Sequence, residues 1–265
     1  MDAQAAPGVM DAQGDALIGS TGFVGQALSA QRAFDAAFHS TDIEQIEGRH
    51  FSRIVCAGVS AVKWWANANA AEDQHGIDRL TRHLDHVEAD RFVLISTVDV
   101  YGTPVGVDEG DAVPEPGLHP YGMHRARLEA WVLRRFPHAH VVRLPALFGP
   151  GLKKNALFDL LHGNRLEHVD PASRFQWYPL ERLADDIDRV QALGLPLVNL
   201  ATEPVGMAEV RRRFFPGCVL GGQSRAVAYD VRTRHGAALG GGPRYMLGAE
   251  AVLEAMGRFV DASRA

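Results

Sequence analysis

Three glycines that follow a short apolar stretch constrain the fold of this chain more than any other feature. Ala16–Ile18 is apolar enough for a buried strand, and Gly19, Gly22 and Gly25 follow it at intervals of three. The range 23–30 then suits a helix. At such a helix N-terminus, unpaired N–H groups and the positive end of the helix dipole allow a pyrophosphate to approach wherever a Cβ is missing. The pattern predicts a phosphate-binding βα turn, and its alternative is a tight turn that binds no ligand.

Strand-like and helix-like segments alternate after this turn. Further strands are predicted at 34–39, 53–57, 91–97, 140–144 and 197–200, and helices at 77–87, 121–136 and 183–190. Repeated βα units of this length predict an α/β fold with a doubly wound parallel sheet, in which ligands bind at the carboxyl ends of the strands. Residues 1–14 are predicted to be a disordered leader, because their composition buries little apolar surface.

Charge and hydropathy exclude several classes of protein. The chain has 265 residues and a formal net charge of -5, whereas a nucleic-acid-binding protein would usually carry a basic stripe. No apolar run approaches the ~18 residues needed to span a bilayer, and the leader lacks the features of a signal peptide. The only cysteines, Cys56 and Cys218, give no disulfide framework and no metal-ligand spacing. We therefore expect a cytoplasmic protein without a nucleic-acid partner, a membrane anchor or a metal site.

Candidate catalytic residues follow the strand predicted at 91–97. Thr97 ends this strand, and Tyr121 and Arg125 lie four residues apart at the start of a predicted helix, so that they share one face. A cation on that face would favour the phenolate and lower the tyrosine pKa from its reference value of ~10. A hydroxyl, a phenol and a cation beside a dinucleotide site suit hydride transfer, with Tyr121 as general acid or base. The alternative is that the three are an ordinary strand-end threonine, a helix N-terminal tyrosine and a surface arginine.

Four short motifs follow one another along the chain. They are Gly19-x-x-Gly22-x-x-Gly25, Ser96-Thr97-x-x-Val100-Tyr101-Gly102, Pro120-Tyr121-Gly122-x-x-Arg125-x-x-x-Glu129 and Arg143-Leu144-Pro145-x-x-Phe148-Gly149-Pro150-Gly151. In this order they resemble the extended short-chain dehydrogenase/reductases of the NAD-dependent epimerase/dehydratase group, over roughly residues 15–200. The resemblance implies a Rossmann-like dinucleotide-binding domain at 15–150 and a small C-terminal substrate lobe at 151–265. A segment at about 175–202 would return from the lobe to the sheet.

The resemblance also implies roles for individual residues. Thr97, Tyr121 and Arg125 would be catalytic, and Asp99, Lys153 and Asn155 would contact the substrate. The cofactor, NAD or NADP, would be held by Gly19, Thr21, Gly22, Phe23, Val24, Gly25, Ser40, Ala57, Gly58, Ser96, Tyr121, Arg125, Pro145 and Leu147. The partner would be a small sugar-like molecule, and a homodimer is compatible with the family.

Two departures from the family pattern are visible. Arg125 stands where members normally carry a lysine, and arginine is planar, bulkier and unable to lose its proton. The acid that usually follows the second strand and binds the ribose of NAD is replaced by His39, Ser40 and Thr41, with Asp42 arriving late. No Arg or Lys is placed in this stretch to meet the 2′-phosphate of NADP. The sequence therefore leaves the choice between the two cofactors open.

Three functions remain open from the sequence. The preferred one is an NAD(P)-dependent oxidoreductase or epimerase that acts on a sugar-like alcohol or ketone, nucleotide sugars included. The second is a catalytically impaired NAD(P)-binding regulatory or interaction protein of the same fold, which the replacement of lysine by Arg125 favours. The third is a sugar dehydratase, because Asp99 lies two residues after Thr97, where dehydratases of this group place an acid.

Overall fold

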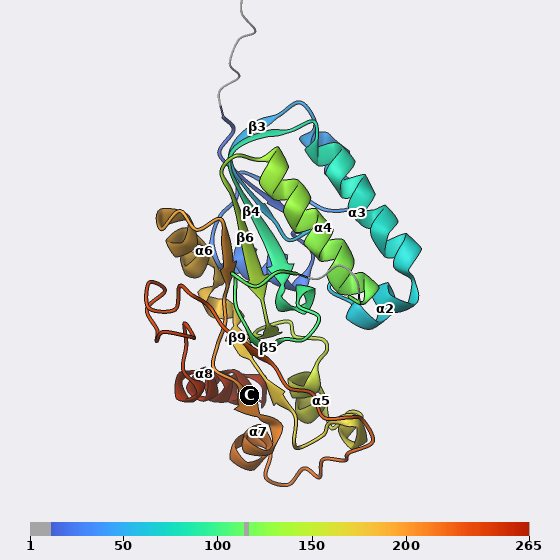
Figure 1. Cartoon of the computed structure of the whole chain (residues 1–265), viewed down its shortest axis with the longest axis vertical. Coiled ribbons are helices and arrows are strands. Elements are labelled where there is room, and N and C mark those ends of the chain that lie inside the picture. Colours follow the sequence, from blue (N-terminus) through green and yellow to red (C-terminus); the bar gives the residue numbers. More distant parts are fainter. Residues whose placement is uncertain (1–11, 114–116, 265) are drawn as a thin grey trace, which may run out of the picture.

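A six-stranded parallel sheet forms the centre of the molecule in the computed structural model, which describes residues 12–113 and 117–264 (Figure 1). The strand order is β10-β6-β4-β3-β1-β2, and each neighbouring pair is parallel. The strands are β1 (Asp15–Ile18), β2 (Ala36–Phe38), β3 (His50–Cys56), β4 (Glu88–Thr97), β6 (Ala139–Leu144) and β10 (Leu197–Asn199). Because β2 and β3 lie on opposite sides of β1, the sheet has a switch point between β1 and β3, where ligands bind in folds of this kind. The predicted doubly wound α/β fold is confirmed.

Helices cover both faces of this sheet. On one face α3 (Ala70–Leu84) and α4 (Pro120–Arg135) lie side by side, and on the other α1 (Phe23–Gln31) contacts α6 (Leu183–Ala192) (Figure 1). Alternate strand residues serve the two faces, so that Ile54 and Phe92 pack with α3 and α4 while Val55 and Val93 pack with α1 and α6. The strands are therefore apolar on both sides, which is why they appear in the sequence as short continuous apolar runs.

Three helices and four short strands from the second half of the chain pack together at the carboxyl end of the sheet, at the bottom of Figure 1, and are called the lobe here, whereas β6, α6 and β10 belong to the sheet and its cover. Its helices are α5 (Ala156–His162), α7 (Met207–Phe214) and α8 (Ala249–Arg264), and its strands are β7 (Ala146–Phe148), β8 (Arg174–Phe175), β9 (Trp177–Pro179) and β11 (Val205–Gly206). Phe148, Trp177 and Met256 belong to its own buried apolar core. The remaining elements are α2 (Lys63–Ala68), β5 (Val105–Val107), β12 (Asp230–Val231) and the short 3-10 helices at 43–46, 98–100, 166–168 and 180–182.

Two sequence expectations differ from the structure. The helix expected from Ile77 begins at Ala70, since Ala, Glu and Gln favour a helix without the apolar spacing on which the expectation rested. Of the leader expected to be disordered, residues 1–11 lie outside the described part of the chain. Gln13 N donates to His50 O at 2.7 Å and Gly14 O accepts from Ser52 N at 2.9 Å, so these two residues extend the pairing with β3. None of the helices in the described ranges is long and apolar enough to cross a membrane.

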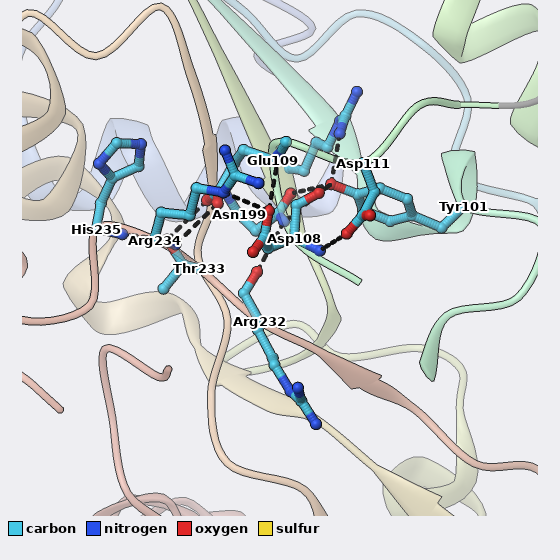
Figure 2. A network of polar contacts seen from close by, with 11 residues as sticks. Tyr101, Asp108, Glu109, Asp111, Asn199, Arg232, Thr233, Arg234 and His235 are labelled. Carbon is cyan, nitrogen blue, oxygen red and sulfur yellow. Dashed lines mark hydrogen bonds and ion pairs between the residues drawn. The ribbon is translucent and has the colours of Figure 1, made fainter. Parts of the chain in front are cut away.

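A polar network joins the sheet to the C-terminal segment 230–235 (Figure 2). The Glu109 carboxylate accepts hydrogen bonds from Asn199 N at 2.8 Å, Thr233 Oγ1 at 2.7 Å and Arg234 N at 2.9 Å. Asn199 Nδ2 donates to the Tyr101 hydroxyl at 3.0 Å. Since Asn199 ends β10, this network fastens the edge of the sheet to two segments that approach it from different parts of the chain.

Candidate active site

The glycine turn after β1 has the geometry of a phosphate cradle. Gly19 has a φ of 86°, a conformation that favours glycine, and a Cβ added to Gly25 would overlap the Gly19 carbonyl oxygen. Gly22 is the N-cap of α1, and within the described ranges no side chain caps this helix. A Cβ on Gly22 would meet only Gly19 O, at 3.3 Å, so the space in front of the helix N-terminus is open. The turn therefore fits the pyrophosphate of a dinucleotide, which requires such a bare N-terminus. Thr21 is exposed beside it, and Phe23 and Val24 begin the helix half-buried.

The other positions expected to hold the cofactor lie at the same edge of the sheet or next to it. Gly19 packs so closely on the peptide between Ala57 and Gly58 that a Cβ would overlap it. Pro145 and Leu147 follow β6, and the turn after β7 comes back to α1, because a Cβ on Gly151 would lie 3.9 Å from the Phe23 ring. The loops after β1, β3 and β7 thus lie together at the carboxyl edge of the sheet, which is where folds of this kind have their cofactor crevice. Ser96 Oγ instead donates to Glu129 at 2.5 Å, within a buried network that includes Arg143.

An arginine that the sequence analysis did not place here lies beside the loop after β2. Arg79 of α3 donates through Nη2 to Ser40 O at 2.8 Å, although it lies far from Ser40 in the sequence. The Asp42 carboxylate turns back to its own loop, where Oδ1 accepts from His39 N at 2.7 Å. Both a carboxylate and a guanidinium therefore lie near this strand end, and the residues fit the adenosine ribose of either dinucleotide.

Thr97 and Tyr121 come together where β4 ends against α4. His119 caps this helix by accepting from Gly122 N at 3.0 Å, Pro120 occupies its first turn, and Tyr121 N donates to Asn67 Oδ1 at 3.0 Å. Tyr121 is 7% exposed. Burial raises the pKa of its phenol, and the charge of Arg125 and a hydrogen bond with Thr97 oppose this effect without reversing it. The expectation that the neighbouring cation would leave Tyr121 with a lowered pKa is therefore wrong for this structure, because desolvation of the phenol outweighs it.

Arg125 is not a surface residue, since it is 4% exposed. Its Nη2 donates to Asp73 Oδ1 at 2.8 Å and to Ser60 O at 2.6 Å, while Nη1 contacts Asp73 Oδ2 and donates to Tyr121 O at 3.2 Å. The alternative of a surface arginine is wrong. Both terminal nitrogens already bind protein acceptors, so the hydrogen bonds expected from Arg125 to a cofactor stay a prediction. Asp73, 52 residues earlier in the sequence, gave no signal beyond an acid in the first turn of a helix.

Asp99 lies at the centre of a second polar cluster beside Thr97. Lys63 Nζ lies 2.8 Å from Asp99 Oδ1, and the Tyr229 hydroxyl donates to the same oxygen at 2.9 Å. Asp99 N donates to Thr97 Oγ1 at 3.1 Å. Burial and the Asp99 carboxylate together raise the pKa of the Tyr229 phenol well above its usual value. Burial lowers the pKa of His119, and the positive charge of Lys63 adds to this shift. Lys63 and Tyr229 were not predicted, because they reach Asp99 from segments 36 and 130 residues away.

The loop before α5 places its polar residues differently from the expectation. Asn155 Oδ1 caps α5 by accepting from Leu157 N at 3.0 Å and Phe158 N at 3.1 Å, and its Nδ2 donates to Leu147 O at 2.8 Å. Lys153 is exposed, whereas Lys154 Nζ donates to Ala61 O at 2.6 Å across the crevice, and burial lowers the pKa of Lys154. Asn155 thus has a capping role, and substrate contacts by Lys153 and Asn155 stay predictions. Among the residues that the structure describes, no group of three or more His, Cys, Asp or Glu side chains is placed to hold a metal ion.

Comparison with known proteins agrees with this geometry. The model of the NAD dependent epimerase/dehydratase family matches residues 31–162, about half of the chain. The structure is similar to UDP-N-acetylglucosamine 4-epimerase from Methanobrevibacter ruminantium M1 in complex with UDP-N-acetylmuramic acid, with a TM-score of 0.75 at 10% identity over 97% of this chain and 100% of that chain. It is also similar to DesIV, a dTDP-glucose 4,6-dehydratase from Streptomyces venezuelae with NAD and TYD bound, with a TM-score of 0.72 at 16% identity over 95% and 97% of the two chains.

A third similar structure is UDP-glucose 4-epimerase from Thermotoga maritima with UDP-glucose, at a TM-score of 0.69 and 14% identity, covering 95% of this chain and 100% of that chain. No curated protein sequence matches. The matched range begins after the glycine turn, so the turn adds independent support from the chain's own geometry. From the parallel sheet, the four motifs at its carboxyl edge and the family match, we conclude that this chain belongs to the NAD-dependent epimerase/dehydratase family.

Proposed function

We propose that this protein is an NAD(P)-dependent enzyme that modifies a nucleotide sugar, or a related sugar-like alcohol or ketone, by hydride transfer. One observation supports it above all. The Thr97 hydroxyl and the Tyr121 phenol interact at the carboxyl end of β4, at the same edge of the sheet as the glycine turn after β1. Two hydroxyls that converge on one point can hold the oxygen of an alcohol or carbonyl, and a phenol can exchange a proton with that oxygen.

The residues divide the work of such a reaction among them. Gly19, Gly22 and Gly25 bind the pyrophosphate at the start of α1, and a bound nicotinamide dinucleotide supplies or accepts the hydride. Thr97 Oγ1 and the Tyr121 hydroxyl orient the reacting oxygen, and Tyr121 carries the proton at that hydroxyl. Tyr229 lies next to this site, since its hydroxyl donates to Asp99 Oδ1.

Asp99 and Lys63 suit the hydroxyl groups of a sugar. One carboxylate oxygen of Asp99 binds Lys63 and Tyr229, which leaves the other as an acceptor, and Lys63 Nζ has further N–H donors. A hydrogen-bond acceptor and a donor side by side match an alcohol hydroxyl, which both donates and accepts hydrogen bonds. The similar structures are those of UDP- and dTDP-sugar enzymes, which supports this substrate class. Epimerase, reductase and dehydratase chemistry all remain candidates for this site.

A second candidate function is a dinucleotide-binding regulatory or interaction protein with an impaired active site. It is favoured by the engagement of both terminal nitrogens of Arg125 with protein acceptors, because a catalytic cation in this position would have to face the ligand. The two candidates differ in one observable. Only the enzyme converts a nucleotide sugar such as UDP-glucose or dTDP-glucose into a different product, with or without a net change of the nicotinamide absorbance.

Binding of NADH and NADPH, measured by fluorescence titration, tests the feature that both candidates share. Gly22→Val should weaken binding by well over tenfold, that is by more than about 1.4 kcal/mol, because the new side chain occupies the place of the pyrophosphate. Gly206→Val is the matched control, since Gly206 also caps a helix, has the same φ of -76° and has open space around its Cβ position. Equal affinity in wild type and Gly22→Val, or no dinucleotide binding at all, would refute the proposal.

A further inference from the structure

The buried pair of Asp73 and Arg125 is matched in both charge and hydrogen bonds. Asp73 is 5% exposed and Arg125 4%, and the two terminal nitrogens of the guanidinium meet the two oxygens of the carboxylate. His124 Nδ1 lies 2.7 Å from Asp73 Oδ2 and adds a third contact. Burial alone would raise the pKa of Asp73, but the hydrogen bonds from Arg125 and His124 hold it below its ordinary value. The pair is therefore ionised and carries no net charge.

Arg125 holds Tyr121 in place through its contacts with the Tyr121 ring, with two backbone carbonyl oxygens and with Asp73. The guanidinium carbon of Arg125 lies over the Tyr121 ring, 4.0 Å from its centroid. Arg125 Nη1 donates to Tyr121 O at 3.2 Å, and Nη2 binds Ser60 O in the loop after β3. Through Asp73 the same guanidinium is held on α3. The phenol is thus located relative to α3, α4 and the loop after β3 by one side chain whose terminal nitrogens both bind protein acceptors.

We propose that Asp73 and Arg125 act as one neutral positioning unit for Tyr121, which leaves the phenol protonated so that it meets the substrate as a proton donor. This inference rests on the proposed function and concerns its reductive direction. In that direction a bound reduced nicotinamide would supply a hydride to the carbonyl carbon, and the π electron pair of the C=O bond would move to oxygen. That oxygen takes the proton of Tyr121. The product is an alcohol, the dinucleotide is oxidised, and Tyr121 is left as a phenolate to be reprotonated from water.

The charges around the phenol agree with a protonated state. The phenol is surrounded or influenced by groups from several elements. They are Arg125 of α4, His119 at the N-cap of α4, Asp73 of α3, Lys63 of α2, Thr97 at the end of β4, Asp99 just after it, and Tyr229 just before β12. Burial raises the pKa of Tyr121, and the negative charges of Asp99 and Asp73 act in the same direction. Arg125 acts against them, and Asp73 lies directly on its guanidinium. A lone cation in this position would favour the phenolate, whereas a paired one does so much less.

A charge cycle on the free protein tests this inference. Tyrosinate formation is followed by ultraviolet difference spectroscopy between each protein and its Tyr121→Phe derivative, over the pH range in which near-ultraviolet circular dichroism shows a folded chain. Asp73→Asn keeps the shape but leaves Arg125 unpaired, so the pKa of Tyr121 should fall by about one unit. Arg125→Gln leaves Asp73 unpaired, so Tyr121 should show no tyrosinate before the chain unfolds. The double variant Asp73→Asn with Arg125→Gln should titrate like wild type.

Asp186→Asn serves as the matched control. Asp186 is also a buried aspartate bound to an arginine and a tyrosine, Arg182 and Tyr178, but on α6 at the other face of the sheet. Its loss should leave the Tyr121 titration unchanged. Shifts of the same sign in both single variants, or no fall in Asp73→Asn, would overturn the inference, and the isosteric Asp73→Asn alone decides it if the others do not fold. The experiment needs no ligand. A protein that titrates as expected but binds no dinucleotide therefore refutes only the proposed function.

Discussion

The hydroxyl group of Tyr121 is the group on which the proposed chemistry depends most directly. Tyr121→Phe removes the proton but keeps the ring under Arg125, so turnover should fall by about two to four orders of magnitude while NADH affinity stays close to wild type. Turnover is measured from the nicotinamide absorbance with UDP- and dTDP-sugars. Thr97→Val should cost less, because it removes one hydrogen bond and no proton donor. Tyr178→Phe, which loses a hydroxyl bonded to Asp186 outside the crevice, should leave turnover unchanged. A fully active Tyr121→Phe enzyme would assign the proton to another group.

Single residues also show where sequence reasoning reaches and where it stops. The spacing of Tyr121 and Arg125 predicts that they share a helix face, and the structure confirms it by placing the guanidinium on the ring. Their electrostatics could not be predicted, because the effect of Arg125 depends on Asp73, whose position in the sequence gives no sign of the pairing. Burial of the phenol, the largest cause of its raised pKa, is likewise a property of the packed protein alone.

At the scale of elements, charged residues fasten the helices of one face to the strands beneath them. Asp188 of α6 accepts hydrogen bonds from Arg32 after α1 and Arg53 of β3, at 2.7 and 2.9 Å, and Arg53 also contacts Asp15 of β1. The hydrogen bond from Arg32 is the largest cause of the lowered pKa of Asp188, and it prevails over burial, which acts in the opposite direction. Four elements that are distant in the sequence are held together at this point.

This cluster predicts a pH dependence of stability. A lowered carboxyl pKa in the folded state means that Asp188 stabilises the protein fully above the unfolded-state pKa of about 4. The contribution is lost as the pH falls through the lower pKa of the folded state. Urea unfolding should therefore show wild type more stable than Asp188→Asn at neutral pH, with the difference shrinking in acid. Asp185→Asn, an exposed neighbour on α6, is the control and should show no such difference. A difference between wild type and Asp188→Asn that does not change with pH would contradict the assignment.

The elements of the central sheet and the helices that cover it were largely predictable from periodicity, whereas α2, α5, α7, α8 and the short strands outside the sheet were not. The six sheet strands and the helices at α1, α4 and α6 follow from apolar runs, glycines and helical spacing. The start of α3 could not be found in this way, since its first turn carries Glu72 and Asp73 rather than apolar residues. Lys63 and Tyr229 could not be found either. Each reaches Asp99 from a segment whose path is decided by tertiary packing.

At the scale of the whole molecule, the network around Glu109 holds the late segment 230–235 against the edge of the sheet (Figure 2). Its carboxylate accepts from three donors, two of them backbone N–H groups. Glu109→Gln replaces one acceptor by an NH₂ group and leaves at least one donor without its partner, which should lower the free energy of unfolding by about 1 kcal/mol. Hydrogen exchange should increase at residues 230–235. Glu44→Gln at an exposed position is the control. Unchanged exchange in that segment would mean that the network does not fasten it to the sheet.

The place of β10 in the sheet also has a consequence for biosynthesis. β6 ends at Leu144, but its outer neighbour β10 begins only at Leu197. While the ribosome makes the intervening residues, at about 5–20 residues per second, β6 presents an unpaired edge for several seconds. Such an edge can pair with other chains. The nascent protein is therefore most open to misassociation late in its synthesis, after most of its sheet has already been made.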